Sequence, residues 1–176
     1  MMSIPGLIPS PLGDDQGMEL RPVADADLPF LAAMALLAAF PPGPLPDGAP
    51  EMPHVTRWTA GWGRPGDAGV VARSGQDRIG AAWCRFQADV IARDVAGRPL
   101  PEVVIAVWPE HRARGVGTQM LTALEQAAAD AGHTAISLSV NARNPALRLY
   151  ERAGFEVVGR EDDRCAMVRL LAKPRR

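Results

Sequence analysis

A glycine-rich junction between an apolar strand and a helix is the feature that most restricts how this chain can fold. Residues 103–107 are all apolar, which is typical of a strand covered on both faces, and the segment 112–118 (RARGVGT) follows shortly after. Gly115 and Gly117 lack Cβ atoms, so the backbone there can turn sharply and approach an anion closely. The first amide groups of the following helix have no intrahelical acceptor and attract anions. The junction therefore predicts a cradle for a phosphate-bearing ligand.

Two common phosphate-binding loops differ from this junction in residues on which they depend. A Walker loop requires Gly-Lys-Ser/Thr, whereas Gly117 is followed by Thr118 and Gln119, so the lysine that reaches the terminal phosphates is missing. A dinucleotide-binding loop requires a third glycine, where this chain has Met120. A nucleotide-binding regulatory domain is therefore disfavoured. Taken alone, the two glycines are also compatible with a simple tight connection between strand and helix.

A second motif follows after one predicted helix and one predicted strand, at residues 144–155 (NPALRLYERAGF). The segment Arg112-x-x-Gly115-x-Gly117 resembles the acetyl-CoA pyrophosphate loop of the GNAT family of N-acetyltransferases. The second motif resembles that family's Asn-x-Ala-x-x-Leu-Tyr-x-x-x-Gly-Phe segment. Two motifs in the family's order are far more specific than either alone, and the resemblance extends over roughly residues 19–171.

The resemblance implies an α/β fold, the GNAT fold, with a mixed, mostly antiparallel central sheet of about seven strands. Helices flank this sheet, which splays between its two central strands, where acetyl-CoA would bind. The 176 residues fit one domain, expected at 18–172 after a flexible N-terminal tail at 1–17. Apolar patterns and turn residues predict strands at 19–23, 69–73, 78–86, 103–107, 135–140, 155–159 and 165–171. They predict helices from an Asp25 or Asp27 cap to about Ala39, at about 53–61, from Gly117 to Ala131, and at 144–153.

Transfer of an acyl group from a thioester to an amine requires a group that accepts the proton of the amine. A lysine-like amine has a pKa near 10.4, so this proton must leave before or during attack, directly or through water. Glu102 stands at the start of the central strand, where the resemblance places an acidic base in many members. A solvent-facing residue at a strand start is the structural alternative. Glu51, His54 and a water chain ending on backbone carbonyls remain open as other bases.

The resemblance assigns two further roles in catalysis. Tyr150, the single tyrosine, falls on the family position that donates a proton or hydrogen bond to the sulfur of CoA, and a phenol of pKa near 10 is protonated at neutral pH. Its structural alternative is a core tyrosine near a helix end. A backbone N–H near Val107, where the family's central strand bulges, would stabilise the oxyanion.

The cofactor-binding residues follow from the same resemblance, and acetyl-CoA is the expected acyl donor, with no metal. Asn144 would touch the pantetheine, although an Asn before a Pro also caps a helix well. Arg112 and Arg114 would add charge near the phosphates, with ordinary surface exposure as the alternative. The full set comprises Ala106, Val107, Arg112, Ala113, Arg114, Gly115, Val116, Gly117, Thr118, Asn144, Ala146, Leu147 and Tyr150.

Composition narrows the class of partner and the compartment. The formal net charge of −1 gives no basic stripe for nucleic acid or an anionic membrane, so a small-molecule or peptide amine is the expected acceptor. Cys84 and Cys165 show neither metal-site nor disulfide-framework spacing and are expected to be reduced and buried. The N-terminus lacks the basic region of a secretory signal, and the most apolar run, 31–40, is about half a membrane span. These features favour a cytoplasmic protein, and a homodimer would be common for the family.

The sequence therefore predicts an acetyl-CoA-dependent N-acetyltransferase in which a primary amine attacks the thioester directly, in a ternary complex without an acyl-enzyme. The alternative is a non-catalytic acyl-CoA-binding or sensor module of the same fold. The identity of the acceptor depends on the weakly patterned segment 41–67, which carries Trp58 and Trp62. These tryptophans are candidates for an acceptor pocket, together with Trp83, for which core packing inside a strand is the stronger interpretation.

Overall fold

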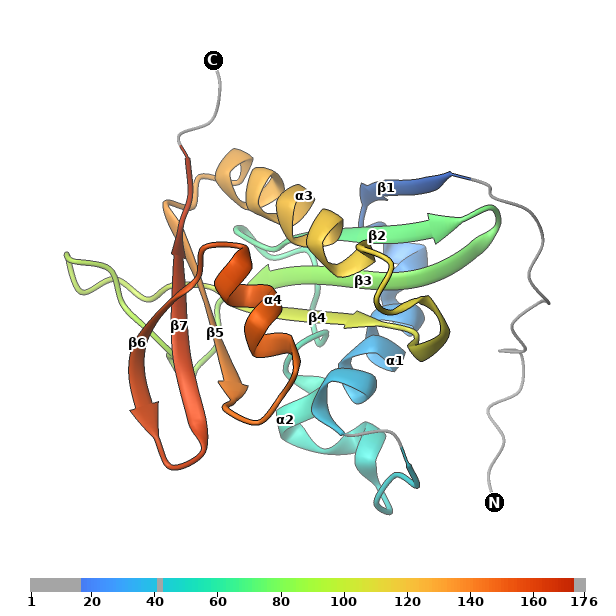
Figure 1. Ribbon diagram of the computed structural model, residues 1–176, viewed down its shortest axis with the longest axis horizontal. Helices are drawn as coiled ribbons and strands as arrows, with labels where there is room; N and C mark the ends of the chain where they lie inside the picture. The colour runs from blue at the N-terminus through green and yellow to red at the C-terminus, as the bar shows by residue number, and fades with distance from the viewer. Residues whose placement is uncertain (1–16, 41–42, 173–176) are drawn as a thin grey trace.

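The structure is a computed structural model that describes residues 17–40 and 43–172 (Figure 1). The expected N-terminal tail therefore lies outside the described residues except for Gly17. Within the described part of the chain, no helix combines the length and the apolar character that crossing a bilayer requires. The boundaries expected for the acetyltransferase domain stay a prediction.

In the described part of the chain, seven strands form one sheet in the order β1-β2-β3-β4-β5-β7-β6. Every neighbouring pair is antiparallel except β4 and β5, which are parallel, so the predicted mixed, mostly antiparallel sheet is confirmed. The strands are β1 (Met18–Pro22), β2 (Ala68–Ser74), β3 (Asp77–Arg85), β4 (Glu102–Val107), β5 (Ala135–Asn141), β6 (Glu156–Glu161) and β7 (Arg164–Leu170).

Helices cover both faces of the sheet (Figure 1). The α-helices are α1 (Leu28–Ala39), α2 (Pro53–Thr56), α3 (Val116–Asp130) and α4 (Ala146–Arg152), and 3-10 turns occupy η1 (Asp25–Asp27), η2 (Ala49–Glu51) and η3 (Pro109–His111). Two predicted helices are shorter than expected. α2 stops at Thr56 and continues as turns, and α4 begins at Ala146 because the Asn144 side chain accepts the Ala146 N–H at 2.9 Å instead of entering the helix.

The expected cap of the first helix is confirmed in position but not in its bonding, because Asp27 occupies the N-cap position of α1 and its side chain makes no capping hydrogen bond. The carboxylate is 1% exposed and accepts hydrogen bonds from Arg21 at 2.6 and 2.7 Å and from Arg78 at 3.2 Å. The backbone N–H of Ala24 donates a further bond at 2.9 Å. The hydrogen bond from Arg21 is the largest cause that lowers the pKa of Asp27 to about 2. Asp27 thus links β1, β3 and the start of α1.

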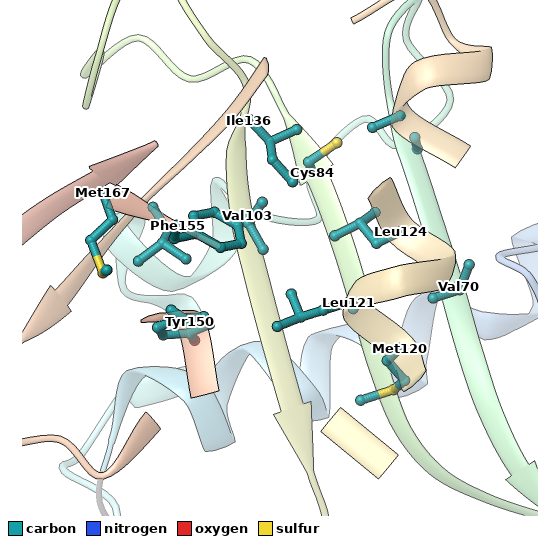
Figure 2. Close-up of a cluster of buried hydrophobic side chains, with 14 of the residues drawn as sticks. Val70, Cys84, Val103, Met120, Leu121, Leu124, Ile136, Tyr150, Phe155 and Met167 are labelled. Carbon is teal, nitrogen blue, oxygen red and sulfur yellow. The ribbon is translucent and has the colours of Figure 1, made fainter. Parts of the chain in front are cut away.

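Two apolar cores lie on opposite faces of the sheet. The first packs α3 and α4 on the strands and contains Leu121, Tyr150 and Phe155 (Figure 2). The second packs α1 and α2 on the other face. β4 contributes to both, with Val103 in the first core and Val104 in the second, so its predicted coverage on both faces is confirmed.

The parallel contact between β4 and β5 is short. Its register consists of the single pair Glu102 and Ser137, and the Ser137 N–H donates to the Pro101 carbonyl at 2.9 Å. Beyond this pair the two strands diverge, with α4 in front of the opening (Figure 1). The predicted splay between the central strands is therefore present, and it widens toward the end of β4 that leads into the glycine-rich loop.

Candidate functional site

The glycine-rich loop contains left-handed backbone conformations, which residues with a Cβ rarely adopt. Gly115 has φ +78° and precedes α3 as its N-cap, and Ala113 has φ +58° although it carries a Cβ. The first intrahelical bond runs from the Gln119 N–H to the Gly115 carbonyl at 3.1 Å. The amides of residues 116–118 therefore have no intrahelical acceptor, and Gly115 offers no side chain that would cap them. This arrangement leaves an exposed set of N–H donors at the positive end of a helix dipole.

At Gly117 the absence of a side chain matters for packing rather than for the backbone conformation. A Cβ at this position would lie 3.1 Å from Cδ2 of Leu149 on α4, which is tighter than ordinary contact. Gly117 therefore lets the start of α3 approach α4 closely. This contact brings the two sequence motifs together in space, one supplying the loop and the other the helix that borders the splay.

The strand β4 presents alternate backbone groups to the splay. The Trp108 N–H donates to Ile79 on the β3 side, so by alternation the backbone groups of Ile105 and Val107 face β5. The Val107 carbonyl accepts a hydrogen bond from Nε of Arg112 at 3.0 Å, which ties the loop to the strand. Ala106 instead places its side chain in the core under α1. The structure thus brings Val107 and Arg112 together at the splay, whereas Ala106 faces away and Ile105, which the sequence reasoning missed, lies beside the opening.

Glu102 is buried at the narrow end of the splay, so the solvent-facing alternative is wrong. Its carboxylate lies 3.4 Å from Nη2 of Arg57, and Nη1 of the same guanidinium contacts Asp89 at 3.1 Å. Burial is the largest influence on the carboxyl and raises the pKa of Glu102, while the nearby Arg57 charge and the Trp58 indole oppose that rise. The other candidate bases lie differently, since Glu51 and His54 are exposed and His54 packs edge-on against Phe40.

The segment that carries Arg57 and Trp58 is fastened to β3 through its main chain. The Trp83 indole donates to the Trp58 carbonyl at 2.9 Å, and Trp83 is fully buried, as its strand position predicted. The Arg85 guanidinium, also fully buried, donates to the carbonyls of Arg57, Ala60 and Gly61 at 3.4, 2.9 and 3.2 Å. It also pairs with Asp67 at 3.0 Å. Sequence reasoning missed Arg85 because a charged residue at a strand end reads as exposed.

Tyr150 lies in the core on α4, 9% exposed, with its ring edge-on to Phe155 at 5.7 Å (Figure 2). Its hydroxyl makes no hydrogen bond with any residue that the structure describes. Burial raises the pKa of Tyr150 to about 12, so the hydroxyl keeps its proton at neutral pH. The geometry is compatible with a core tyrosine and with a proton donor.

The second motif places its remaining candidates around the start of α4. The Asn144 side chain accepts the Ala146 N–H, so it has a structural role at this helix start. Ala146 and Leu147 are half-buried and pack against the core under α3. Arg114 is exposed in the loop. Asn144, Ala146 and Leu147 thus lie at the start of α4, whereas Arg114 lies in the loop between β4 and α3.

A hollow of about 600 Å³ lies elsewhere, between the loop at 91–100 and strands β5, β6 and β7. None of the predicted site residues lines it. In the ranges 17–40 and 43–172, no cluster of three or more His, Cys, Asp and Glu side chains is placed to hold a metal ion.

Several solved structures share this fold. The YncA protein of Salmonella typhimurium, solved with its cofactor acetyl-CoA, is 20% identical with a TM-score of 0.68, covering 91% of this chain and 97% of that one. The ribosomal-protein-alanine N-acetyltransferase of Brucella melitensis is 23% identical with a TM-score of 0.62, covering 87% and 99%. The PaiA N-acetyltransferase of Thermoplasma acidophilum, in complex with coenzyme A, is 16% identical with a TM-score of 0.62, covering 88% and 99%.

Sequence comparisons give a family. The mycothiol acetyltransferase of Clavibacter sepedonicus is 36% identical over 92 residues, which is 45% of this chain but only 30% of that enzyme. The sequence model of the acetyltransferase (GNAT) family matches residues 31–155, a span that contains both motifs and the splay between β4 and β5. The chain therefore belongs to the GNAT family of acetyltransferases.

Proposed function

We propose that this chain transfers the acetyl group of acetyl-CoA to a primary amine of a small molecule or peptide, by direct attack within a ternary complex. One observation carries the proposal: strand β4 leads from a buried carboxylate, Glu102, to a helix start with unpartnered amides, and its neighbour β5 diverges along the way. A phosphate cradle and a candidate base thus lie at opposite ends of one opening. In this proposal an extended thioester cofactor lies along β4 between these two ends.

In this proposal the amides of residues 113–118 hold the pyrophosphate, whereas the Arg112 N–H, also expected to take part, already donates to the Pro109 carbonyl at 3.2 Å. The side chains of Arg112 and Arg114 add charge. The backbone of Val107 and Ile105 contacts the pantetheine arm, and Ile105 replaces Ala106, whose side chain faces the core under α1. Asn144, Ala146 and Leu147 border the arm from α4. The unpartnered donors and the two left-handed residues, Ala113 and Gly115, support this fit.

Acetyl-CoA supplies the activated acyl group as a thioester, and the chain supplies proton transfer and orientation. Glu102 accepts a proton from the amine, directly or through water, and burial makes its carboxylate a stronger base. The protonated hydroxyl of Tyr150 donates to the departing sulfur. A backbone N–H of β4 that faces the splay stabilises the oxyanion, which contributes about 3 kcal/mol in other acyl-transfer enzymes.

The cysteines support direct attack rather than an acyl-enzyme. Cys84 and Cys165 are both buried and unpaired, as expected from their apolar surroundings. Burial raises the pKa of Cys84 to about 12, which disfavours the thiolate that nucleophilic catalysis requires. Neither thiol lies among the residues that border the splay.

The proposal is tested by incubating the protein with acetyl-CoA and a panel of amines and measuring the release of free thiol. We expect Glu102→Gln to lower kcat by about 10²- to 10⁴-fold. Tyr150→Phe is expected to lower it as well, and both variants should still bind acetyl-CoA by calorimetry. Glu110→Gln, an exposed glutamate in the connection after β4, is the matched control and should behave as the wild type. Binding without turnover of any amine would favour the sensor alternative.

A further inference from the structure

Arg57 occupies the route between solvent and Glu102. Its side chain is 28% exposed and lies between Asp89, 89% exposed, and Glu102, 7% exposed. An acceptor that approaches Glu102 from the Asp89 side therefore meets this guanidinium first. The main chain of Arg57 is held in place, because its carbonyl accepts hydrogen bonds from Arg85 and Gln87, both at 3.4 Å. The backbone is anchored while the side chain has rotatable bonds beyond it.

The contacts of the Arg57 guanidinium are incomplete. Its distance of 3.4 Å to Glu102 exceeds the roughly 2.7–2.9 Å of a strong charge-assisted hydrogen bond. Nε of Arg57 is buried and has no partner among the described residues, and the same holds for Nε1 of Trp58. The Trp58 indole is close enough to lower the pKa of Glu102, yet the pair does not reach hydrogen-bond geometry. Nε of Arg57 and Nε1 of Trp58 are thus two adjacent buried donors that could both bind an oxygen acceptor beside the candidate base.

The charges around Glu102 balance in the free protein. Glu102 and Asp89 are negative, whereas Arg57 and Arg164, whose charges both act on Glu102, are positive. Arg164 is already engaged with the Ser139 side chain at 2.9 Å. An ammonium group that binds at Glu102 takes the place of the Arg57 guanidinium. The displaced guanidinium keeps only Asp89, a carboxylate whose side chain is 89% exposed, and its buried Nε still has no acceptor, so a carboxylate on the acceptor would supply the missing partner.

We propose that the acceptor is an amine bearing a carboxylate close to its amino group, as in an α-amino acid, and that Arg57 exchanges Glu102 for this carboxylate. This inference rests on the function proposed above. The amino group then lies beside Glu102, and a zwitterion leaves the net charge of the site unchanged, whereas a polyamine adds uncompensated positive charge. In the reaction the N–C bond forms as the C–S bond breaks. Of the two protons lost by the ammonium, one passes through Glu102 to solvent and the other balances the free thiol.

The test compares three matched forms of each acceptor, namely each of the twenty standard amino acids, its amide and its decarboxylated amine. Spermidine is included as a polyamine. Thiol release gives kcat and KM for the wild type, Arg57→Gln and Arg64→Gln, an exposed control on the same segment. We expect the wild type to favour the best amino acid over its amide by at least about tenfold. Arg57→Gln should lower kcat/KM for that acid by about 10- to 100-fold, mainly through KM, and change the amide by less than about threefold. Arg64→Gln should leave both unchanged.

The inference is overturned if the wild type prefers amides, decarboxylated amines or spermidine, a result that does not require a folded variant. It is also overturned if Arg57→Gln weakens all three forms equally. Calorimetry with acetyl-CoA distinguishes failure of the proposed acceptor from failure of the proposed acetyltransferase function. Cofactor binding with turnover only of amines that lack a carboxylate refutes the role of Arg57 and leaves the proposed function intact. Absence of cofactor binding in the wild type refutes both.

Discussion

Replacing Arg85 with leucine is expected to destabilise the protein by about 3–5 kcal/mol, the usual cost of removing one partner from a buried ion pair. Arg85 is fully buried and its partner Asp67 has a side chain that is 4% exposed. Asp67 would keep two backbone donors, the N–H groups of Gly63 and Arg64, each at 3.1 Å, which places the loss near the lower end of that range. For a chain of this size, about 2–4 °C per kcal/mol corresponds to a decrease in Tm of roughly 6–20 °C.

Urea denaturation with the double variant Arg85→Leu/Asp67→Asn measures the cause of this loss. If the unpaired carboxylate dominates, the second substitution should restore about 1 kcal/mol or more. Arg98→Leu, which removes an exposed pair with Asp94, serves as the control and should cost less than about 1 kcal/mol. Because Arg85 also holds the carbonyls of the segment carrying Arg57, the folded variant should show a raised acceptor KM with an unchanged Kd for acetyl-CoA. A loss below 1 kcal/mol for Arg85→Leu would refute this reasoning.

Three further predictions concern single residues. Ala113→Gly should relieve backbone strain at φ +58°, which is about 1–2 kcal/mol. The greater conformational entropy of glycine in the unfolded chain offsets about 0.5–1 kcal/mol of this gain, so thermal unfolding should show a slightly higher Tm. Asp27 has a pKa lowered from 3.8 to about 2, so its stabilisation is present above pH 4 and lost as the pH falls through 2. Asp27→Asn should therefore cost about 1–2 kcal/mol in urea at pH 7 and progressively less as the pH falls through 2. If Glu102 is the base, kcat/KM should rise with pH through a pKa above the usual glutamate range, and this rise should disappear in Glu102→Gln.

The sequence predicted most of the fold because the elements carry strong local signals. The apolar run 103–107 predicted a strand covered on both faces, and β4 contributes to both cores. Helix boundaries were less accurate where side chains compete with the backbone. Asn144 was expected at the start of this helix and as a candidate cap; its side chain accepts the Ala146 N–H, and α4 begins at Ala146. Asp27 pairs with Arg21, six residues earlier, and with Arg78, 51 residues later, and no local pattern reveals the second partner.

In the candidate site too, features set by nearby residues could be predicted, whereas contacts between distant segments could not. The glycine-rich loop could be placed because the conformation at Gly115 depends on its own backbone. The surroundings of Glu102 could not, because Arg57 reaches it from a segment 45 residues earlier. Strand alternation would have favoured Ile105 over Ala106 beside the splay, since odd-numbered residues of β4 present their backbone to β5. Burial of Arg85 depends on carbonyls of the turns after α2, which the Pro- and Gly-rich segment conceals.

Calorimetric titration of acetyl-CoA into the wild type and Gly117→Trp tests whether the start of α3 binds the cofactor. A side chain at Gly117 begins 3.1 Å from Leu149, so the indole would have to lie between the start of α3 and α4, next to the unpartnered amides. Thr122→Trp places the same side chain at an exposed position further along α3 as the control. We expect the wild type and Thr122→Trp to bind acetyl-CoA, and Gly117→Trp to lose binding while circular dichroism shows a folded protein. A wild type that does not bind, or a Gly117→Trp variant that binds equally well, would contradict the account.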